Sequence, residues 1–327
     1  MKNDVGDGKF FTFRYALLPF FIIFAKNFER HMILIADSGS TKTDWALVND
    51  KVYDHSVIAS FKTQGITPIH QTPEEMRHIL GQELLQQLST FPRGHLVNSG
   101  ILESSLLDKL NVFFYGSGCT PAHVPVVKRL LTEVLSPVYV EVHSDLMGSA
   151  RALCQHEPGI ACILGTGANS CLYDGEQIVQ NTPALGYILG DEGSGAVLGR
   201  LFMNAIFKNP AFADIRDEYL AKTKLTQADI IQKVYREPMA NRFLASTSLY
   251  IGEHLGNPLI QQLVVDNFRH FFRSNVAPYQ RRDLPVSFVG SMAEHYPDQL
   301  AQAAEAEGFI LGQVMQRPIE GLTIYHS

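Results

Sequence analysis

The sequence has few features that would assign it to a class at first sight. Cysteine is scarce: the chain has 327 residues and 4 cysteines, at positions 119, 154, 162 and 171. No two of them have the C-x-x-C spacing of a zinc site or a thioredoxin-like redox pair. We therefore expect four reduced thiols, as in a cytoplasmic protein. The sequence also lacks G-x-x-x-x-G-K-[ST], which excludes a P-loop nucleotidase.

An excess of basic charge is missing too. Lysine and arginine number 27 against 33 acidic residues, which gives a formal net charge of −6, and the basic residues are scattered. A nucleic-acid-binding protein normally carries a basic face, so we expect no nucleic-acid partner. Apolar residues make up 46% of the chain, which is ordinary for a globular protein with a sizeable core, and the length suits one large or two medium domains.

No apolar run is long enough to span a bilayer. The run from Tyr15 to Ala25 is too short, although with the basic residues before it this run resembles the h-region of a secretory signal. Residues 1–31 therefore have three readings: a signal peptide, a membrane-associated anchor, or a stretch upstream of the true start. We favour the last, because Met32 is followed at once by the buried-strand pattern Ile33–Ala36.

Two stretches share one plan. In the first, the strand pattern Ile33–Ala36 is followed by a Gly/Ser turn and a second strand, and in the other, Ile160–Leu164 is followed by a Gly/Thr turn and a strand. Glycine allows positive φ and a close backbone approach to a ligand at such turns. Because each turn opens its own α/β unit, the pair indicates a duplicated fold with a ligand between its halves.

The rest of the chain agrees with α/β layering. We expect helices at Pro73–Leu88, Pro121–Leu135, Leu146–Cys154 and about Tyr296–Glu307, strands at Val112–Tyr115, Val138–Val142 and Val286–Val289, and a helix-rich region at about 193–280. The expected division is an N-terminal extension at 1–31, one domain at 32–150 and a second, with a helical insertion, at 151–327. The hinge is expected near residues 145–158.

Both turns have the composition of a phosphate cradle. Backbone N–H groups and hydroxyls that converge on one point form an anion-binding nest. The expected donors are Gly39, Ser40, Thr41, Lys42 and Thr43 in the first turn and Gly165, Thr166 and Gly167 in the second. Asp37, at the end of the strand, could hold a hydrated Mg²⁺, which prefers carboxylates and retained waters. The alternative is two structural hairpins with Asp37 as a turn residue.

Asp145 is the candidate catalytic base. It follows a predicted strand and precedes a predicted helix, so its carboxylate would point into the crevice where α/β folds bind ligands. Phosphoryl transfer to a hydroxyl needs a group that accepts the proton, and an aspartate suffices. The alternative is that Asp145 only caps its helix.

A third segment combines acids with glycines. Gly186, Asp191 and Glu192 lie in Gly186–Gly195, which contains four glycines around two carboxylates. Polar groups that grip sugar hydroxyls are typically carried by such loops. The alternative is a loop whose acids cap a helix beginning near Ser194.

These segments together resemble one protein family. Asp37–Trp45, Gly165–Ser170, Gly186–Gly195 and Gly290–Ala293 are similar, in this order, to the motifs of the BadF/BadG/BcrA/BcrD ATPase family. That family includes N-acetylglucosamine kinases and the ATPase activators of 2-hydroxyacyl-CoA dehydratases, and it belongs to the actin/hexokinase/Hsp70 superfamily. The resemblance covers essentially Met32 to Leu322.

The resemblance implies a fold and residue roles. The fold would be two ribonuclease-H-like domains that close over ATP and Mg²⁺ and exclude water. Gly290 and Ser291 fall in the adenosine motif, Asp145 at the catalytic base, and Asn169 and Asp191 where the sugar kinases contact the sugar. A homodimer is the assembly that the family suggests. One position departs: Thr67 stands where these kinases usually have a sugar-contacting asparagine.

Three functions follow from these observations. The first is an ATP-dependent kinase that phosphorylates the primary hydroxyl of an amino sugar, giving the 6-phosphate of N-acetylglucosamine or a relative. The second is a non-catalytic sugar-binding regulator, which Thr67 keeps open. The third is an ATPase of the dehydratase-activator type, whose iron–sulfur cluster would need cysteine thiolates brought close together.

Overall fold

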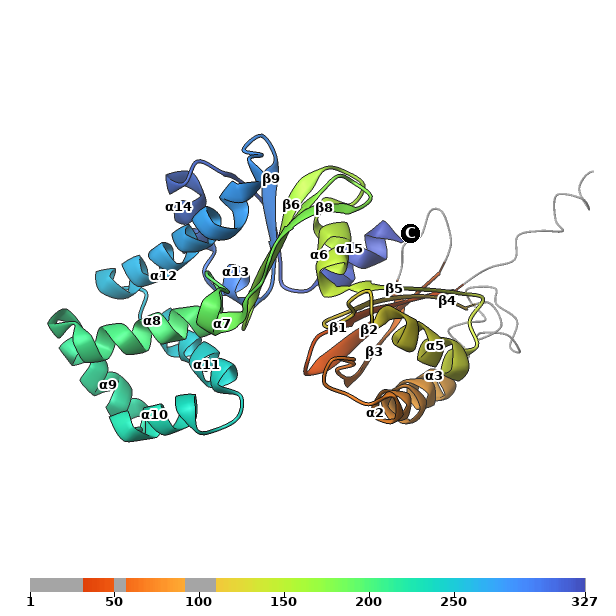
Figure 1. Cartoon of the computed structure of the whole chain (residues 1–327), viewed down its shortest axis with the longest axis horizontal. Coiled ribbons are helices and arrows are strands. Elements are labelled where there is room, and N and C mark those ends of the chain that lie inside the picture. Colours follow the sequence, from red (N-terminus) through yellow and green to blue (C-terminus); the bar gives the residue numbers. More distant parts are fainter. Residues whose placement is uncertain (1–31, 50–56, 92–109, 327) are drawn as a thin grey trace, which may run out of the picture.

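The computed structural model describes residues 32–49, 57–91 and 110–326, so the expectations for residues 1–31 lie outside the described part. Two five-stranded sheets form the frame of the molecule (Figure 1). The first contains β1 (Met32–Ser38), β2 (Lys42–Asn49), β3 (Val57–Gln64), β4 (Leu110–Gly116) and β5 (Tyr139–Ser144). The second contains β6 (Gly159–Leu164), β7 (Ala168–Tyr173), β8 (Ile178–Thr182), β9 (Pro285–Val289) and β10 (Ile310–Met315).

The two sheets have the same topology. The strand orders are β3-β2-β1-β4-β5 and, read in the same sense, β8-β7-β6-β9-β10. In each sheet the first three strands form an antiparallel meander, the fourth strand pairs in parallel with the first, and the fifth pairs in parallel with the fourth. The chain thus folds as two ribonuclease-H-like halves, which confirms the duplicated α/β fold predicted from the two strand–turn–strand stretches.

Hydrophobic composition explains why β1 lies at the centre of its sheet. Leu34, Ile35 and Ala36 have no exposed surface, as expected of a strand that is covered on both faces. One face is covered by α2 (Pro73–His78), the π-helical turn η1 (Ile79–Leu84), α3 (Leu85–Thr90) and α5 (Val124–Leu135). The helix predicted at 73–88 is therefore present, with a π-helical turn in its middle, whereas the helix predicted from Pro121 begins at Val124.

Two helices lie between the sheets. α6 (Asp145–Cys154) follows β5, and α15 (Pro318–Tyr325) follows β10, so they occupy equivalent places in the two halves (Figure 1). They pack so closely that a Cβ on Gly321 would lie 2.4 Å from the carbonyl oxygen of Ala152. Leu322 of α15 is buried against Ile33 and Ile35 of β1. The domain boundary at residue 150 remains a proposal. It assigns α15 to the second domain, although α15 packs on the first sheet.

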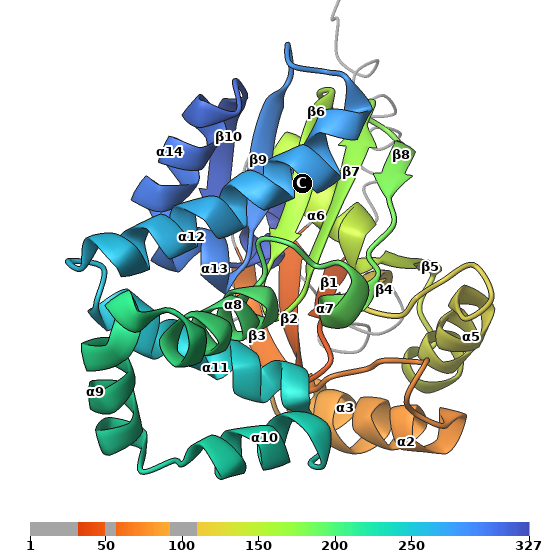
Figure 2. The same cartoon turned by 60° about the vertical axis from the view of Figure 1, so that its left-hand side comes forward.

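The remaining helices belong to the second half. They are α7 (Gly186–Leu189), α8 (Gly195–Lys208), η3 (Pro210–Phe212), α9 (Ala213–Thr223), α10 (Gln227–Tyr235), α11 (Ala240–Glu253), α12 (Pro258–Phe271), η4 (Phe272–Val276), η5 (Ala277–Tyr279), α13 (Ser291–His295) and α14 (Pro297–Ala306). Figure 2 shows α8 to α11 gathered beyond one end of the second sheet. Within the described ranges, no helix is both long and apolar enough to cross a membrane.

Candidate active site

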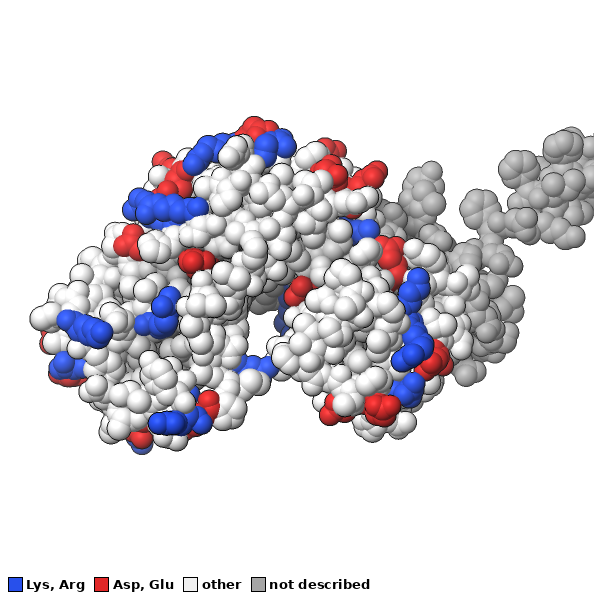
Figure 3. Space-filling view, viewed as in Figure 1, with Lys and Arg blue, Asp and Glu red and all other residues white. Residues whose placement is uncertain are grey.

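The two hairpin tips face one cleft. The turn between β1 and β2 and the turn between β6 and β7 both line a cavity of about 480 Å³. Figure 3 shows the opening between the two halves, with basic side chains at its edge. The lining residues that the sequence predicted are Asp37, Gly39, Ser40, Thr41, Lys42, Asp145, Gly165, Thr166, Gly290 and Ser291. The carboxyl ends of parallel strands meet here, which is where α/β sheets bind ligands.

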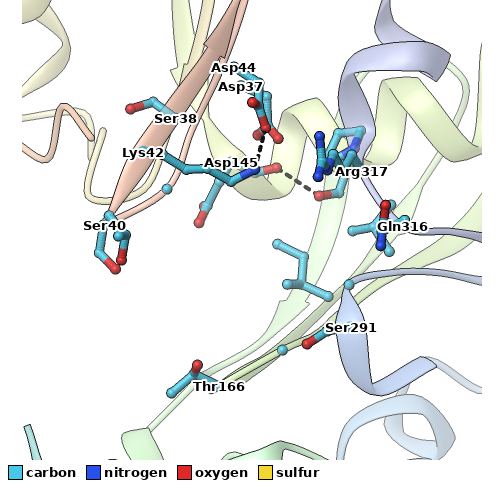
Figure 4. A pocket seen from close by; sticks show the side chains of 18 residues that line it. Asp37, Ser38, Ser40, Lys42, Asp44, Asp145, Thr166, Ser291, Gln316 and Arg317 are labelled. Atoms are coloured by element: carbon cyan, nitrogen blue, oxygen red, sulfur yellow. Dashed lines mark hydrogen bonds and ion pairs between the residues drawn. The ribbon is translucent and has the colours of Figure 1, made fainter. Parts of the chain in front are cut away.

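Acidic groups gather at one end of the cleft. Asp37 is the last residue but one of β1. Lys42 Nζ donates a hydrogen bond of 2.7 Å to Asp44 Oδ2 (Figure 4). Burial, followed by the nearby charges of Asp145 and Asp44, raises the pKa of Asp37 from 3.8 to about 7, although Lys42 and Arg317 oppose the rise. The ionised carboxylate is therefore held in a place where it repels its neighbours, and a cation in the cleft would relieve that repulsion.

The donor set fits a hydrated magnesium ion. Asp44 Oδ1 is buried and has no hydrogen-bond partner among the described residues, and Asp37 offers a second carboxylate on the adjacent strand. The described residues contain no cluster of three or more histidine, cysteine, aspartate or glutamate side chains that could enclose a metal. Two carboxylates with open space beside them suit Mg²⁺, which keeps several of its waters.

Asp145 begins α6 and does not cap it. Ser144 is the N-cap residue, because its Oγ accepts from the backbone N–H of Met147 at 3.2 Å. Asp145 Oδ1 accepts from the backbone N–H of Leu146 at 2.9 Å, and the Ser117 hydroxyl also hydrogen-bonds the carboxylate. Burial raises the pKa of Asp145, while these hydrogen bonds oppose the rise. Ser144 therefore caps α6 in place of Asp145, and the carboxylate of Asp145 faces the cleft.

A second pocket of about 430 Å³ adjoins the cleft, and Asp145 lines both. Asn169 lines this pocket, together with Asn181, Thr120 and apolar side chains. Asn169 Oδ1 accepts from the backbone N–H of Ser170 at 2.9 Å and from Asn181 Nδ2 at 3.0 Å. Because these donors occupy the oxygen, the amide nitrogen of Asn169 is the atom that can donate to a ligand. The pocket therefore combines a carboxylate, an amide donor and apolar walls.

The acidic loop lies behind the second turn. The Asp191 carboxylate accepts from the backbone N–H groups of Ala168 and Gly186, and one of its oxygens would lie 2.9 Å from a Cβ on Gly167. Glu192 accepts from Asn275 Nδ2 at 3.2 Å. None of Gly186, Asp191 and Glu192 is among the residues that line the two cavities. Nor do the acids cap α8, since Ser194 accepts from the Val197 N–H.

Three other residues predicted at the site lie behind the residues that line the two cavities. Thr43 is buried, with its hydroxyl hydrogen-bonded to Ser38 Oγ at 2.7 Å and donating to the Gln64 carbonyl at 3.2 Å. Gly167 does not line the cleft, and a side chain there would meet the Asp191 carboxylate. Thr67 is buried beside Gly118, and its hydroxyl has no partner among the described residues. These residues shape the turns and the pocket wall from within.

Positive φ occurs elsewhere than at the hairpin tips. Gly39, Gly165 and Gly167 do not have a positive φ. The expectation that glycine serves these two turns by adopting a positive φ is therefore wrong. Gly290 does, with φ of 115° and room for no side chain: a Cβ would lie 2.4 Å from the Leu164 carbonyl oxygen. The freedom of glycine is therefore used at the segment that follows β9.

Sequence reasoning missed Gln316 and Arg317. Both follow β10 and line the cleft (Figure 4), and the charge of Arg317 lowers the pKa of Asp37. The only signal was the weak apolar pattern at Ile310–Met315, the strand whose carboxyl end is followed by Arg317. Asn181 was missed because it reaches Asn169 through the pairing of β7 and β8.

The four cysteines are free thiols. Burial raises the pKa of Cys119, Cys154 and Cys171 to about 12, and that of Cys162 well above its usual value. Cys162 and Cys171 have no exposed surface. Protonated thiols in the core are poorly suited to bind an iron–sulfur cluster, which requires thiolates.

Comparison with known proteins agrees with this geometry. The chain matches no family model and no curated protein. Among solved structures, it is 44% identical to a Porphyromonas gingivalis protein that carries the provisional name N-acetylglucosamine kinase, with a TM-score of 0.77 over 90% of this chain and 98% of that one. A Chromobacterium violaceum protein with the same provisional name is 17% identical, with a TM-score of 0.63 over 91% and 99% of the two chains, and shows the likeness of fold.

Two ribonuclease-H-like halves with a ligand cleft between them define an actin-like ATPase fold. Within that superfamily, the chain belongs to the BadF/BadG/BcrA/BcrD ATPase family, in its N-acetylglucosamine kinase-like group.

Proposed function

We propose that the protein is an ATP-dependent sugar kinase that phosphorylates the primary hydroxyl of an amino sugar, N-acetylglucosamine before others, to its 6-phosphate. The observation that carries the proposal is the position of Asp145, which lines both the cleft between the two turns and the adjoining pocket. A group at this junction can serve a phosphate donor on one side and an acceptor hydroxyl on the other.

The nucleotide would lie along the cleft. Its phosphates would be held by backbone N–H groups and hydroxyls of the turns at Gly39–Lys42 and Gly165–Thr166, with the adenosine toward Gly290 and Ser291. Asp37, with Asp44 Oδ1, would hold Mg²⁺ through its waters. When bound, Mg²⁺ neutralises charge on the transferring phosphoryl group. Clamping the polyphosphate from both halves would also draw them together and exclude water.

Asp145 would act as the general base. The hydroxyl oxygen of the sugar attacks the γ-phosphorus, the bond between the β–γ bridging oxygen and the γ-phosphorus breaks, and ADP leaves with that oxygen. The hydroxyl proton passes to the Asp145 carboxylate. The Ser117 hydroxyl and the Leu146 N–H orient this carboxylate and favour its ionised form.

The sugar would occupy the second pocket. Asn169 offers an amide donor, which suits a hydroxyl or carbonyl oxygen of the sugar. Apolar walls such as Val124 and Ile178 suit the methyl group of an N-acetyl substituent. Asp191 would reach the sugar only through a movement of its loop, and Thr67 would act on the pocket through Gly118.

A coupled ADP-release assay over amino sugars and plain hexoses tests the proposal. We expect release that depends on an amino sugar and falls by at least 100-fold in Asp145→Asn, whereas Asp298→Asn, a matched change at an exposed aspartate on α14, leaves it unchanged. Equal release with and without sugar would favour the ATPase alternative, against which the buried cysteines already weigh. Sugar binding without turnover would favour the regulator.

Location and assembly are part of the same proposal. A kinase needs ATP, so we place the protein in the cytoplasm, and we propose the homodimer that the family suggests. Light scattering of the purified full chain measures the assembly directly: a single species of twice the chain mass supports it, and a monomer refutes it.

A further inference from the structure

A cation from the helical region reaches the first phosphate turn. Arg242 lies in the first turn of α11, and its Nη2 donates to Thr41 Oγ1 at 3.0 Å and to Ser40 Oγ at 3.5 Å. Arg242 and Thr41 are separated by 201 positions and belong to opposite halves of the molecule. Sequence patterns gave no sign of this contact.

Arg242 also lines a smaller pocket of about 250 Å³ that adjoins the cleft. Gly165, Thr166 and Ser291 line both this pocket and the main cleft. The guanidinium is therefore placed between the first turn, which it touches, and the second turn, with which it shares a pocket. Both turns are part of the proposed phosphate site.

The guanidinium is not matched by a carboxylate. No ion pair to Arg242 occurs among the described residues. By contrast, five other arginines each pair with a carboxylate: Arg77, Arg151, Arg269, Arg273 and Arg281. Its acceptors in this structure are neutral hydroxyls on an exposed surface. Hydrogen bonds from a guanidinium to an anionic oxygen are roughly twice as strong as neutral ones, and the planar fork suits phosphate.

We propose that Arg242 is a phosphate-binding residue of the nucleotide site, delivered across the cleft from α11. It exchanges the hydroxyls of Ser40 and Thr41 for phosphate oxygens of the nucleotide. This inference rests on the proposed function, because it requires a nucleotide in the cleft.

Calorimetric titration with Mg²⁺–ADP and with adenosine tests it on the full-length protein. In Arg242→Ala we expect ADP to bind about 10- to 100-fold more weakly, the usual effect of losing a hydrogen bond to a charged group. Adenosine, which has no phosphate, should bind within twofold of wild type. In the kinase assay the KM for ATP should rise by a similar factor while the KM for the sugar stays unchanged.

Three further variants separate charge from structure. Arg242→Lys keeps the charge but not the fork and should lie between wild type and Arg242→Ala, and Arg242→Gln should match Arg242→Ala. The control Arg236→Ala removes an exposed arginine just before α11 that lines none of these cavities and should bind ADP like wild type. Equal ADP affinity in wild type and Arg242→Gln overturns the inference, as does an equal loss for ADP and adenosine. If wild type itself fails to bind ADP, the proposed function fails instead.

Discussion

Removing the charge of Asp37 should stabilise the protein in the absence of ligands. In the unfolded chain an aspartate loses its proton near pH 4, whereas burial and two neighbouring carboxylates keep the pKa of Asp37 at about 7 in the folded protein. Between these values the folded state binds more protons than the unfolded state, so the contribution of this group to stability falls as pH rises. Above pH 7 the full cost of the ionised carboxylate is present.

The size of the effect follows from the pKa. A rise from 3.8 to about 7 corresponds to about 4 kcal/mol, at about 1.4 kcal/mol per pH unit. Because the carboxylate also borders the water of the cleft, we expect about half of this, roughly 2 kcal/mol, after screening. The free energy of unfolding of Asp37→Asn should therefore exceed that of wild type by roughly 2 kcal/mol at pH 8, and by less than about 1 kcal/mol at pH 5.

Urea denaturation at the two pH values measures this difference. Trp45, the single tryptophan, is buried on β2 next to Asp44 and reports unfolding by its fluorescence. The control Asp298→Asn removes an exposed carboxylate from the first turn of α14 and should not stabilise the protein. An Asp37→Asn variant that is no more stable than wild type at pH 8 would refute the electrostatic reasoning. The same variant should lose Mg²⁺-dependent binding of ADP, because the carboxylate that destabilises the empty cleft is the proposed magnesium ligand.

Three further predictions concern other parts of the site. Asp145→Asn should lower kcat by about 10²- to 10⁴-fold in steady-state kinetics and leave the affinity for ADP, measured by calorimetry, within threefold; a retained kcat would remove Asp145 from the chemistry. Gly290→Ala forces a Cβ to within 2.4 Å of the Leu164 carbonyl at a φ of 115°, so we expect a loss of about 1–3 kcal/mol in thermal or urea unfolding, and an unchanged midpoint would contradict the close approach. Arg317→Ala should lower kcat and raise the pKa of Asp37 further, since it removes an opposing charge; an unchanged pH dependence of Mg²⁺ binding would show that Arg317 does not act on Asp37.

Much of the fold was predictable because the central strands have a clear hydrophobic pattern. Met32–Ala36 of β1 and Ile160–Leu164 of β6 are apolar and are followed by glycine-containing turns, so both halves could be recognised from local pattern. The strands that were not predicted, β3, β8 and β10, lie at sheet edges. Their residues are half exposed and mixed in polarity, so their hydrophobic pattern is weak.

The site was predictable to the extent that strand ends meet. Asp37 lies near the carboxyl end of β1, and Asp145, Gly165 and Gly290 directly follow other strands. The carboxyl ends of such strands converge, and the cleft brings these residues together. Arg242 could not be predicted, because its place depends on how a helix more than 200 positions away in sequence packs across the cleft. Asp191 could be predicted as a loop acid, but not that its carboxylate would turn back to the Ala168 N–H.

The central claim is that one nucleotide bridges the two turns while Asp145 faces the acceptor. A crystal structure with Mg²⁺, a non-hydrolysable ATP analogue and N-acetylglucosamine tests it most directly. We predict phosphate oxygens within hydrogen-bond distance of backbone N–H groups in both turns, at Gly39–Lys42 and Gly165–Gly167, and the primary hydroxyl of the sugar within hydrogen-bond distance of the Asp145 carboxylate. A nucleotide bound by one turn alone, or a sugar hydroxyl remote from Asp145, would contradict the account.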